Sequence, residues 1–403
     1  MDKQAIWGLL LCSVAILVYY LIFLPWLFPP QRRPVQPQPA KEAEVKTPAP
    51  AVEIEKSELV PAPPSEVPIV DNILLENDLL KTTWTNEGAA LKDAILKKYK
   101  DYRGGERLCL IEPSEASPPP MALEEVLGKY DLSKRIYQVK EITPNRISLQ
   151  TTLEEGLRLT KILSLEEGRY HVDAEIVLEN ISQAELPVRY TVVSSSQICL
   201  EGTPEYDMAS VVGVDVGGGK IRLIRKTLSE LVKSPERNES HGITWAGGVN
   251  RYFASVLKAG SSDWVYAVNS RPVLEKDSKG KANLVVSIET ANLTLPPQGA
   301  ERHEYQFFLG PKREDVLKDY KLETLLGFGA FTPLSKGLLQ ILNAFYAIIP
   351  NYGVDIIILT FLVKVVLFPL TRKSQMSMYK MQKLQPLLEQ LREKYKKDKQ
   401  KMG

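Results

Sequence analysis

Two long apolar stretches, one near each end of the chain, most constrain what this sequence can fold into. The first, AIWGLLLCSVAILVYYLIFLPWLF (5–28), has no charged residue, and a helix of this length crosses a hydrocarbon core of roughly 30 Å. It is longer than the apolar core of a cleaved signal peptide and ends in Pro25 and Trp26. We therefore expect an uncleaved signal-anchor transmembrane helix over 1–28 and a second transmembrane helix over 352–370.

The distribution of charge predicts the orientation of both spans. From Thr371 to the end the chain has ten Lys or Arg against three acids, a net charge of 10 − 3 = +7. Residues 1–370 have 41 basic and 46 acidic residues, a net charge of −5. The positive-inside rule places the basic tail in the cytoplasm. With two spans the N-terminus is then also cytoplasmic, and about residues 29–350 are exported.

A proline-rich segment, 29–70, follows the first span. Eleven of the 28 prolines lie between residues 29 and 68, without a hydrophobic period. We interpret this segment as a disordered linker, with a specific Pro-motif ligand as the alternative. Two cysteines in the exported part, Cys109 and Cys199, are either a single disulfide or two unpaired thiols.

Residues 71–326 have the pattern of a large all-β domain. In YHVDAEIVLEN (170–180), Tyr170, Val172, Ala174, Ile176 and Leu178 share one face of a strand. The segments RYTVVSSSQI, DWVYAVNS, ANLVVSIET and EYQFFLG also predict short strands, and no regular helices intervene. We expect a β-sandwich.

No catalytic motif emerges from this domain. The segment GVDVGGGKI (213–221) fails the phosphate-loop pattern, so Gly217–Gly219 are predicted to form a hairpin turn or loop. His171, His241 and His303 have no metal-ligand spacing. We expect neither an enzyme nor a cofactor.

The segment before the second span, 331–350, is apolar over most of a helix but too short to span. It predicts an interfacial amphipathic helix, with a buried packing helix under the sandwich as the alternative.

Lys364 lies inside the second span, where a charge costs roughly 2.5–3.5 kcal/mol. One interpretation is that its side chain reaches the cytoplasmic headgroups, about 9 Å away. The other is that it faces a wet cavity in a helix bundle, on a weakly polar stripe with Thr360 and Thr371. Asp355 is nine residues away, on roughly the opposite side of the helix.

The tail, 371–403, predicts a basic cytoplasmic helix. Apolar residues recur at spacings of three and four, which is the seam of a coiled coil, and Pro386 interrupts it: Met378, Met381, Leu384, Leu388, Leu391 and Tyr395. A seam needs a partner helix, so we expect either a longer protein or a partner chain.

The order of these parts resembles the YidC membrane protein insertase family of Gram-negative bacteria. The most specific segment is NYGVDIIILTFLVKVVLFPLTRKSQMSMYKMQKLQPLLEQLREKYKKDKQKM (351–402), and YQFFLGPKREDVLKDY (305–320) and LLGFGAF (325–331) also match. The exported domain matches more loosely, through TNEGAALKDAILKKYKD (85–101) and NRYFASVLKA (250–259). The family continues through a helical hairpin and further spans.

This resemblance implies a fold, a site and partners. The exported domain would be a periplasmic β-supersandwich similar to sugar-binding mutarotase-like folds. A hydrophilic groove with Lys364 and Thr360 would accept the polar segment of a nascent membrane protein. The family generally has arginine at the position of Lys364, so bidentate recognition is not implied here, whereas charge attraction is. The first half of a cytoplasmic hairpin would contact the substrate and the ribosome or the signal recognition particle receptor, through Arg372, Lys373, Lys380, Lys383 and Arg392.

The resemblance further implies a multi-pass protein of the bacterial inner membrane that acts in the lipid bilayer, alone or with the Sec translocon, and no specific DNA binding. The alternative function is a membrane-tethered periplasmic binding module for a carbohydrate-like ligand, whose spans are only anchors.

Overall fold

The computed structural model describes residues 60–61, 67–100, 107–199, 208–274, 282–327 and 332–394. The chain divides into two compact units, Lys46–Leu326 and a second unit formed by Met1–Val45 with Gly327–Gly403. The predicted signal anchor, most of the linker and residues 395–403 lie outside the described residues.

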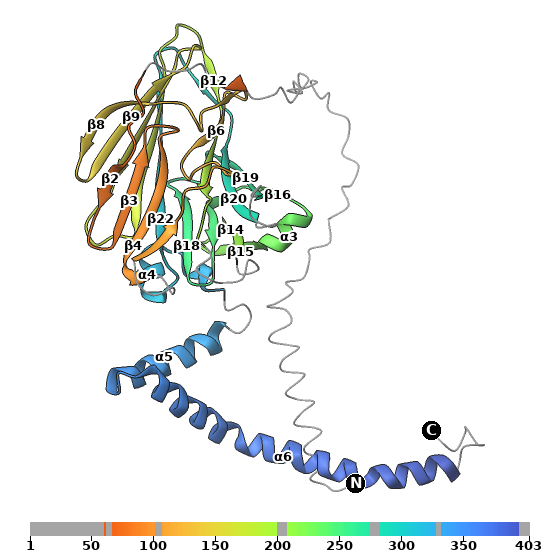
Figure 1. Cartoon of the computed structure of the whole chain (residues 1–403). Coiled ribbons are helices and arrows are strands. Elements are labelled where there is room, and N and C mark those ends of the chain that lie inside the picture. Colours follow the sequence, from red (N-terminus) through yellow and green to blue (C-terminus); the bar gives the residue numbers. More distant parts are fainter. Residues whose placement is uncertain are drawn as a thin grey trace, which may run out of the picture. The chain divides into compact units, whose positions relative to one another are not determined.

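The larger unit is built around a nine-stranded antiparallel sheet (Figure 1). Its strands lie in the order β15 (Ile221–Thr227), β14 (Ala209–Asp215), β17 (Ile243–Val249), β18 (Phe253–Ala259), β22 (Ala300–Pro311), β11 (His171–Asn180), β10 (Leu157–Ser164), β9 (Arg146–Thr152) and β8 (Gln138–Thr143). Most neighbours are joined by short turns, but β22 lies between β18 and β11, which are far from it in sequence.

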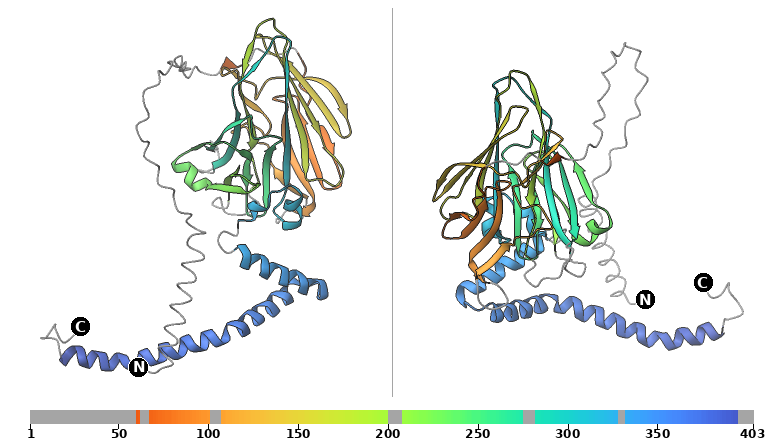
Figure 2. Two further views of the ribbon diagram at one scale, coloured as in Figure 1. Left: turned by 180° about the vertical axis from the view of Figure 1, so that it is seen from behind. Right: turned by 45° about the horizontal axis from the view of Figure 1, so that its top comes forward.

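A seven-stranded sheet packs against it. Its order is β1 (Val60–Pro61), β7 (Tyr130–Asp131), β6 (Leu123–Val126), β13 (Tyr190–Ser195), β20 (Ala282–Thr290), β19 (Val265–Leu274) and β16 (Glu236–Glu239). β1 pairs with β7 in parallel, whereas the other pairs are antiparallel. Strands β13, β19 and β20 contact β17 of the larger sheet, so the two sheets form a sandwich, also visible from behind in Figure 2.

The described residues of this unit also form two smaller sheets and three short helices. The smaller sheets are the four-stranded β2 (Ile73–Glu76), β3 (Leu80–Thr85), β4 (Ala90–Lys100) and β5 (Arg107–Ile111), and the two-stranded β12 (Leu186–Val188) and β21 (Leu293–Leu295). The helices are α3 (Leu228–Lys233), α4 (Glu314–Asp319) and the 3-10 helix η3 (Glu323–Leu326).

The predicted all-β sandwich is confirmed, and its core follows from period-two patterning. The five residues predicted to share a face around β11 are all buried. β10 alternates in the same way, with Leu157, Leu159 and Leu163 wholly buried.

The prediction for Gly217–Gly219 is also confirmed. These residues connect β14 to β15, and all three have positive φ values, between 66° and 98°. Glycine adopts this conformation without the steric cost that a Cβ would bring. The turn is closed by a hydrogen bond from the Val216 N–H to the Lys220 carbonyl, at 2.9 Å.

A buried lysine joins three of the sheets. Lys161, on β10, is wholly buried. Its Nζ donates to the carbonyls of Gly88, Ala89 and Met121, at 3.1, 3.2 and 2.6 Å. Gly88 and Ala89 belong to the turn between β3 and β4, and Met121 precedes β6. Burial lowers the pKa of Lys161 to about 7, while three carbonyl acceptors favour its charged form.

A second polar link crosses the sandwich. The hydroxyl of Tyr190, on β13, lies 2.8 Å from the hydroxyl of Tyr305 and 2.7 Å from Nδ1 of His303, both on β22. Trp264 stacks on the His303 ring at a centroid distance of 4.4 Å. Burial lowers the pKa of His303 to about 4. These groups hydrogen-bond one another, so their burial leaves the two hydroxyls and Nδ1 satisfied.

The other unit contains two described helices, α5 (Thr332–Ile348) and α6 (Tyr352–Lys394). Ile349–Asn351 join them, and the rings of Tyr346 and Tyr352 stack across the elbow at 4.0 Å. Asn351 caps the N-terminus of α6: its Oδ1 accepts a hydrogen bond from the Gly353 N–H, at 3.0 Å. The predicted second span and the described part of the basic tail, 371–394, form a single helix that continues past Pro386.

Candidate functional site

Helix α6 is the one described helix that is long and apolar enough to cross a membrane, over Tyr352–Gln382. Most of its large apolar side chains are uncovered: Ile357 and Phe361 are each 70% exposed, and Val366 is 66% exposed. An apolar surface of this extent requires lipid or other apolar helices around it.

Lys364 is an exposed cation on this apolar helix. No hydrogen bond or ion pair joins it to the described residues. Thr360 precedes it by four residues and therefore lies on the same face, and Thr371 follows by seven. The hydroxyls of Thr360 and Thr371 donate to the carbonyls of Ile356 and Leu367, at 2.7 and 2.9 Å. Each hydroxyl oxygen can still accept a hydrogen bond, so the stripe combines a cation with two acceptors.

Asp355 is the other charged residue in the apolar part of α6. Its side chain is wholly buried, although Val354 and Ile356 on either side are exposed. Neither carboxylate oxygen has a hydrogen-bond donor among the described residues. Nine residues at 100° each turn it 180° away from Lys364, and the rise separates the two by about 13.5 Å. The two charges therefore cannot neutralise each other within this helix.

The basic residues predicted for the cytoplasmic hairpin follow on the same helix. Arg372, Lys373 and Lys380 are exposed, whereas Lys383 and Arg392 lie within α6 but their side chains are not described. Met378, Met381 and Leu384, the first part of the predicted seam, are 53–64% exposed. An uncovered apolar seam flanked by cations has the composition of a surface for another helix.

The β-sandwich domain has a polar hollow of about 430 Å³ on its seven-stranded sheet, which sequence patterns did not reveal. Glu289 on its floor is 5% exposed and forms ion pairs with Arg237 and Arg189. Arg271 pairs with Glu124, which also accepts from Ser287. The hydrogen bond with Glu289 raises the pKa of Arg237 above its usual range. Each of these guanidinium groups is thus already neutralised by a carboxylate. The network is explained by ion pairs between neighbouring strands.

The described residues contain no group of three or more His, Cys, Asp or Glu side chains that could hold a metal ion. Cys109 and Cys199 are half-buried, and no disulfide joins them to each other. Burial raises the pKa of Cys109 to about 12, which disfavours the reactive thiolate. His171 and His303 are buried strand residues, and His241 is exposed.

Two family models match the chain in succession. The YidC periplasmic domain matches residues 72–341, and the 60Kd inner membrane protein family matches residues 344–403. The first covers the β-sandwich and most of α5, and the second covers α6 with Lys364. The boundary between them thus falls close to the elbow between α5 and α6.

Curated relatives align along the whole chain. The membrane protein insertase YidC of Syntrophus aciditrophicus is 29% identical over 436 residues, which are 100% of this chain and 76% of the relative. That of Geotalea daltonii is 26% identical over 417 residues, which are 100% of this chain and 75% of the relative.

Solved structures match more weakly. A putative aldose 1-epimerase from Escherichia coli has a TM-score of 0.42 and 9% identity, covering 60% of this chain and 100% of that chain. At this level the similarity carries no argument about sugar binding, and the mutarotase-like supersandwich stays a prediction. The family is instead shown by the YidC periplasmic domain, which matches more than half of the chain, and the chain therefore belongs to the YidC family.

Proposed function

We propose that this chain takes part in inserting proteins into the bacterial inner membrane, with Lys364 as an attractive positive charge for the polar segment of the incoming protein. The observation that carries the proposal is an exposed cation in the apolar part of α6 that has no ion-pair partner among the described residues, within the region that matches the inner membrane protein family. A passive anchor needs no such charge, and burying one is unfavourable.

The polar stripe of Thr360, Lys364 and Thr371 is chemically suited to this task. A cation attracts acidic side chains and the carbonyl oxygens of a translocating segment. The threonine oxygens accept from its backbone N–H groups. The stripe thereby lowers the cost of desolvating a short polar segment, while the apolar remainder moves into lipid. This mechanism requires no covalent step.

The proposed topology follows the charge distribution. The N-terminus and the basic end of α6 lie in the cytoplasm, the β-sandwich lies in the periplasm, and α5 lies along the outer surface of the membrane. Arg372, Lys373 and Lys380, with Lys383 and Arg392 further along, provide a positive surface for ribosomal RNA or the signal recognition particle receptor. The Sec translocon is a further proposed partner.

The position of the charge can be tested separately from its presence. We expect Lys364→Ala to lower insertion of a small two-span substrate by about tenfold, the equivalent of 1.4 kcal/mol, in cells that depend on this protein. Lys364→Arg should retain insertion because it keeps the charge. The matched control is Lys364→Ala with Val365→Lys, which keeps the charge at nearly the same depth but turns it by 100°.

If Lys364 merely snorkels to the headgroups, the displaced lysine will support insertion as well as the wild type does. If the groove assignment is correct, the displaced lysine will behave like Lys364→Ala. Equal insertion by Lys364→Ala and the wild type would refute the role of the charge, provided that both proteins accumulate to the same level.

A further inference from the structure

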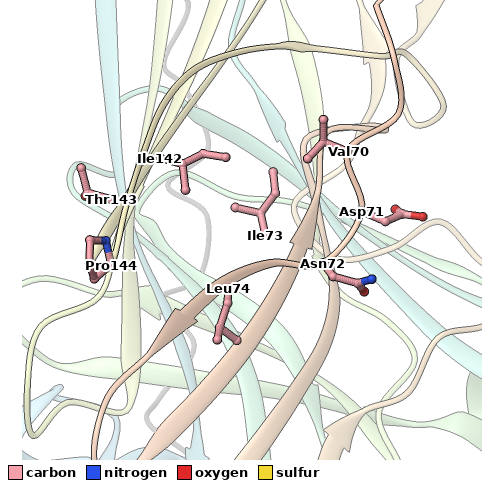
Figure 3. A pocket seen from close by; sticks show the side chains of 8 residues that line it. All are labelled: Val70, Asp71, Asn72, Ile73, Leu74, Ile142, Thr143 and Pro144. Atoms are coloured by element: carbon pink, nitrogen blue, oxygen red, sulfur yellow. The ribbon is translucent and has the colours of Figure 1, made fainter.

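A second hollow in the exported domain lies between the ends of two sheets (Figure 3). Its volume is about 430 Å³, and it is lined from one side by residues 70–74 and from the other by Ile142, Thr143 and Pro144. Ile73, Leu74 and Ile142 give it an apolar character. The hollow does not include any residue of the polar network around Glu289.

Strand edges border this hollow. Its lining includes Ile73 and Leu74, the first two residues of β2, and Ile142 and Thr143, the last two residues of β8. β2 is the outermost strand of the four-stranded sheet, and β8 is the outermost strand of the nine-stranded sheet. Among the described residues, β2 pairs with β3 alone and β8 pairs with β9 alone. Alternate N–H and C=O groups of each outer edge are therefore available for pairing.

The side chains around these edges are unusually apolar for a free surface. Leu74 is 41% exposed, Ile142 is 51% exposed and Ile69, just before the hollow, is 57% exposed. No residue of β8 is buried on either face. Proteins protect free edges with charges and bulges, and β8 has both at Val139–Glu141. β2 pairs with β3 without a bulge, and its one charged residue, Glu76, lies at the end away from the hollow, so β2 is the edge open to pairing and Ile142 is an apolar wall opposite it.

The same domain already accepts an extended segment at another edge. Val60 and Pro61, just before the domain, form β1 and pair in parallel with Tyr130 and Asp131 of β7. The occupant of a strand edge must itself be extended, because only an extended backbone matches the spacing of the free N–H and C=O groups.

We propose that the hollow binds an extended segment of a polypeptide that is being exported, which adds as a strand to the outer edge of β2 and places apolar side chains against Leu74 and Ile142. The identity of the occupant rests on the proposed insertion function, since exported loops of membrane proteins emerge unfolded on this side. Binding of an extended strand at β2 rests on the geometry alone.

Binding can be measured with the full chain in lipid nanodiscs. The probe is a fluorescein-labelled peptide of eight residues, with alternating valine and threonine between two lysines, followed by fluorescence anisotropy. The comparison peptide has the same sequence but is N-methylated at alternate residues, which removes backbone donors and retains the apolar side chains. We expect N-methylation and the variant Ile142→Asp each to weaken binding at least tenfold. Val232→Asp, at a residue that is 52% exposed on α3 and outside the hollow, should bind as the wild type does.

Three results would overturn the proposal. Equal binding of the N-methylated peptide would show apolar adsorption without strand pairing. Unchanged binding by Ile142→Asp, with the thermal unfolding of the wild type, would place the peptide elsewhere. A protein mass that doubles with concentration and is halved by Ile142→Asp would identify a second copy of this chain as the occupant.

The occupant is tested in membranes by introducing the photoreactive residue benzoylphenylalanine at Leu74 or, as a control, at Val232. We expect cross-links from position 74 to the exported loop of a substrate, and none from position 232. Peptide binding without this cross-link would contradict the assignment of an exported polypeptide. The Lys364→Ala variant should still bind the peptide, so failure of the insertion mechanism and failure of this site give different results.

Discussion

Replacing Lys161 by methionine tests how three sheets of the β-sandwich domain are held together. Methionine has nearly the same length but no donor, so the carbonyls of Gly88, Ala89 and Met121 lose the ammonium group that now bonds to each of them at 2.6–3.2 Å. A buried acceptor left without a donor costs about 1–3 kcal/mol. The cost of leaving three carbonyls without a donor exceeds the desolvation free energy that is saved when the ammonium group is removed. We therefore expect a net destabilisation of about 3 kcal/mol.

The assay is thermal unfolding followed by the fluorescence of Trp84 and Trp245, which are both buried in this domain. A loss of about 3 kcal/mol in a domain of this size lowers the melting temperature by roughly 6–12 °C. Lys161→Arg keeps the charge but is too bulky for a closed cage, so it should also destabilise the domain. A Lys161→Met variant that melts within 1 °C of the wild type would refute the reasoning.

The pH dependence provides an independent check. The pKa of Lys161 in the folded domain is about 7, below the value of about 10.4 for a free lysine. Between these values the unfolded chain binds more protons, so the stability of the wild type relative to Lys161→Met rises as pH increases above 7. A difference that stays flat from pH 7 to 9 would show that the carbonyls keep the ammonium charged and outweigh its burial.

Two further predictions concern the same sandwich. The pKa of His303 is about 4 in the folded domain and about 6.5 in the unfolded chain, so the domain should lose about 3 kcal/mol of stability as the pH falls from 6.5 to 4. His303→Gln should flatten this dependence of stability on pH, whereas a substitution of the exposed His241 should not. Gly213 packs against Trp245, and a Cβ at this position would come 2.1 Å from the indole ring. Gly213→Ala should therefore destabilise the domain by about 1–3 kcal/mol, measured by urea unfolding. Gly168→Ala should destabilise it less in spite of the positive φ of Gly168, because the space around Gly168 is open.

Local patterns predicted five strands, which correspond to β11, β13, β19, β20 and β22, but could not predict how the strands associate. The alternation in 170–180 identifies β11 because its inward residues face a single continuous core. The pairing of β11 with β22 joins His171 to Phe308, residues separated by more than a hundred positions. The residues within each strand do not specify its partner, because the pairing depends on how side chains of both strands fill the core of the complete sandwich.

Lys161 shows a signal that was present and was not used. It occupies the inward position between Leu159 and Leu163 of an alternating strand, so its burial follows from the period-two pattern of β10. A lysine at such a position has to find carbonyl or carboxylate partners. Its actual partners could not be predicted, because Gly88, Ala89 and Met121 reach it through turns in which all three have positive φ.

The candidate site on α6 was easier to predict, since a lysine within an apolar segment can be recognised from the sequence alone. The sequence also predicted that Asp355 lies on roughly the opposite side of α6 from Lys364. It did not predict that the carboxylate is buried and has no donor among the described residues.

The separation of these two charges distinguishes their roles. A residue that neutralised Lys364 from a neighbouring surface could not also reach Asp355, because the two lie on opposite sides of α6 and about 13.5 Å apart along its axis. Lys364 is exposed and lies beside two threonine hydroxyls, an arrangement suited to transient contacts with changing partners. Asp355 is wholly buried, and neither of its carboxylate oxygens has a donor among the described residues. We therefore propose the exposed cation, rather than the buried acid, as the group on α6 that contacts successive substrates.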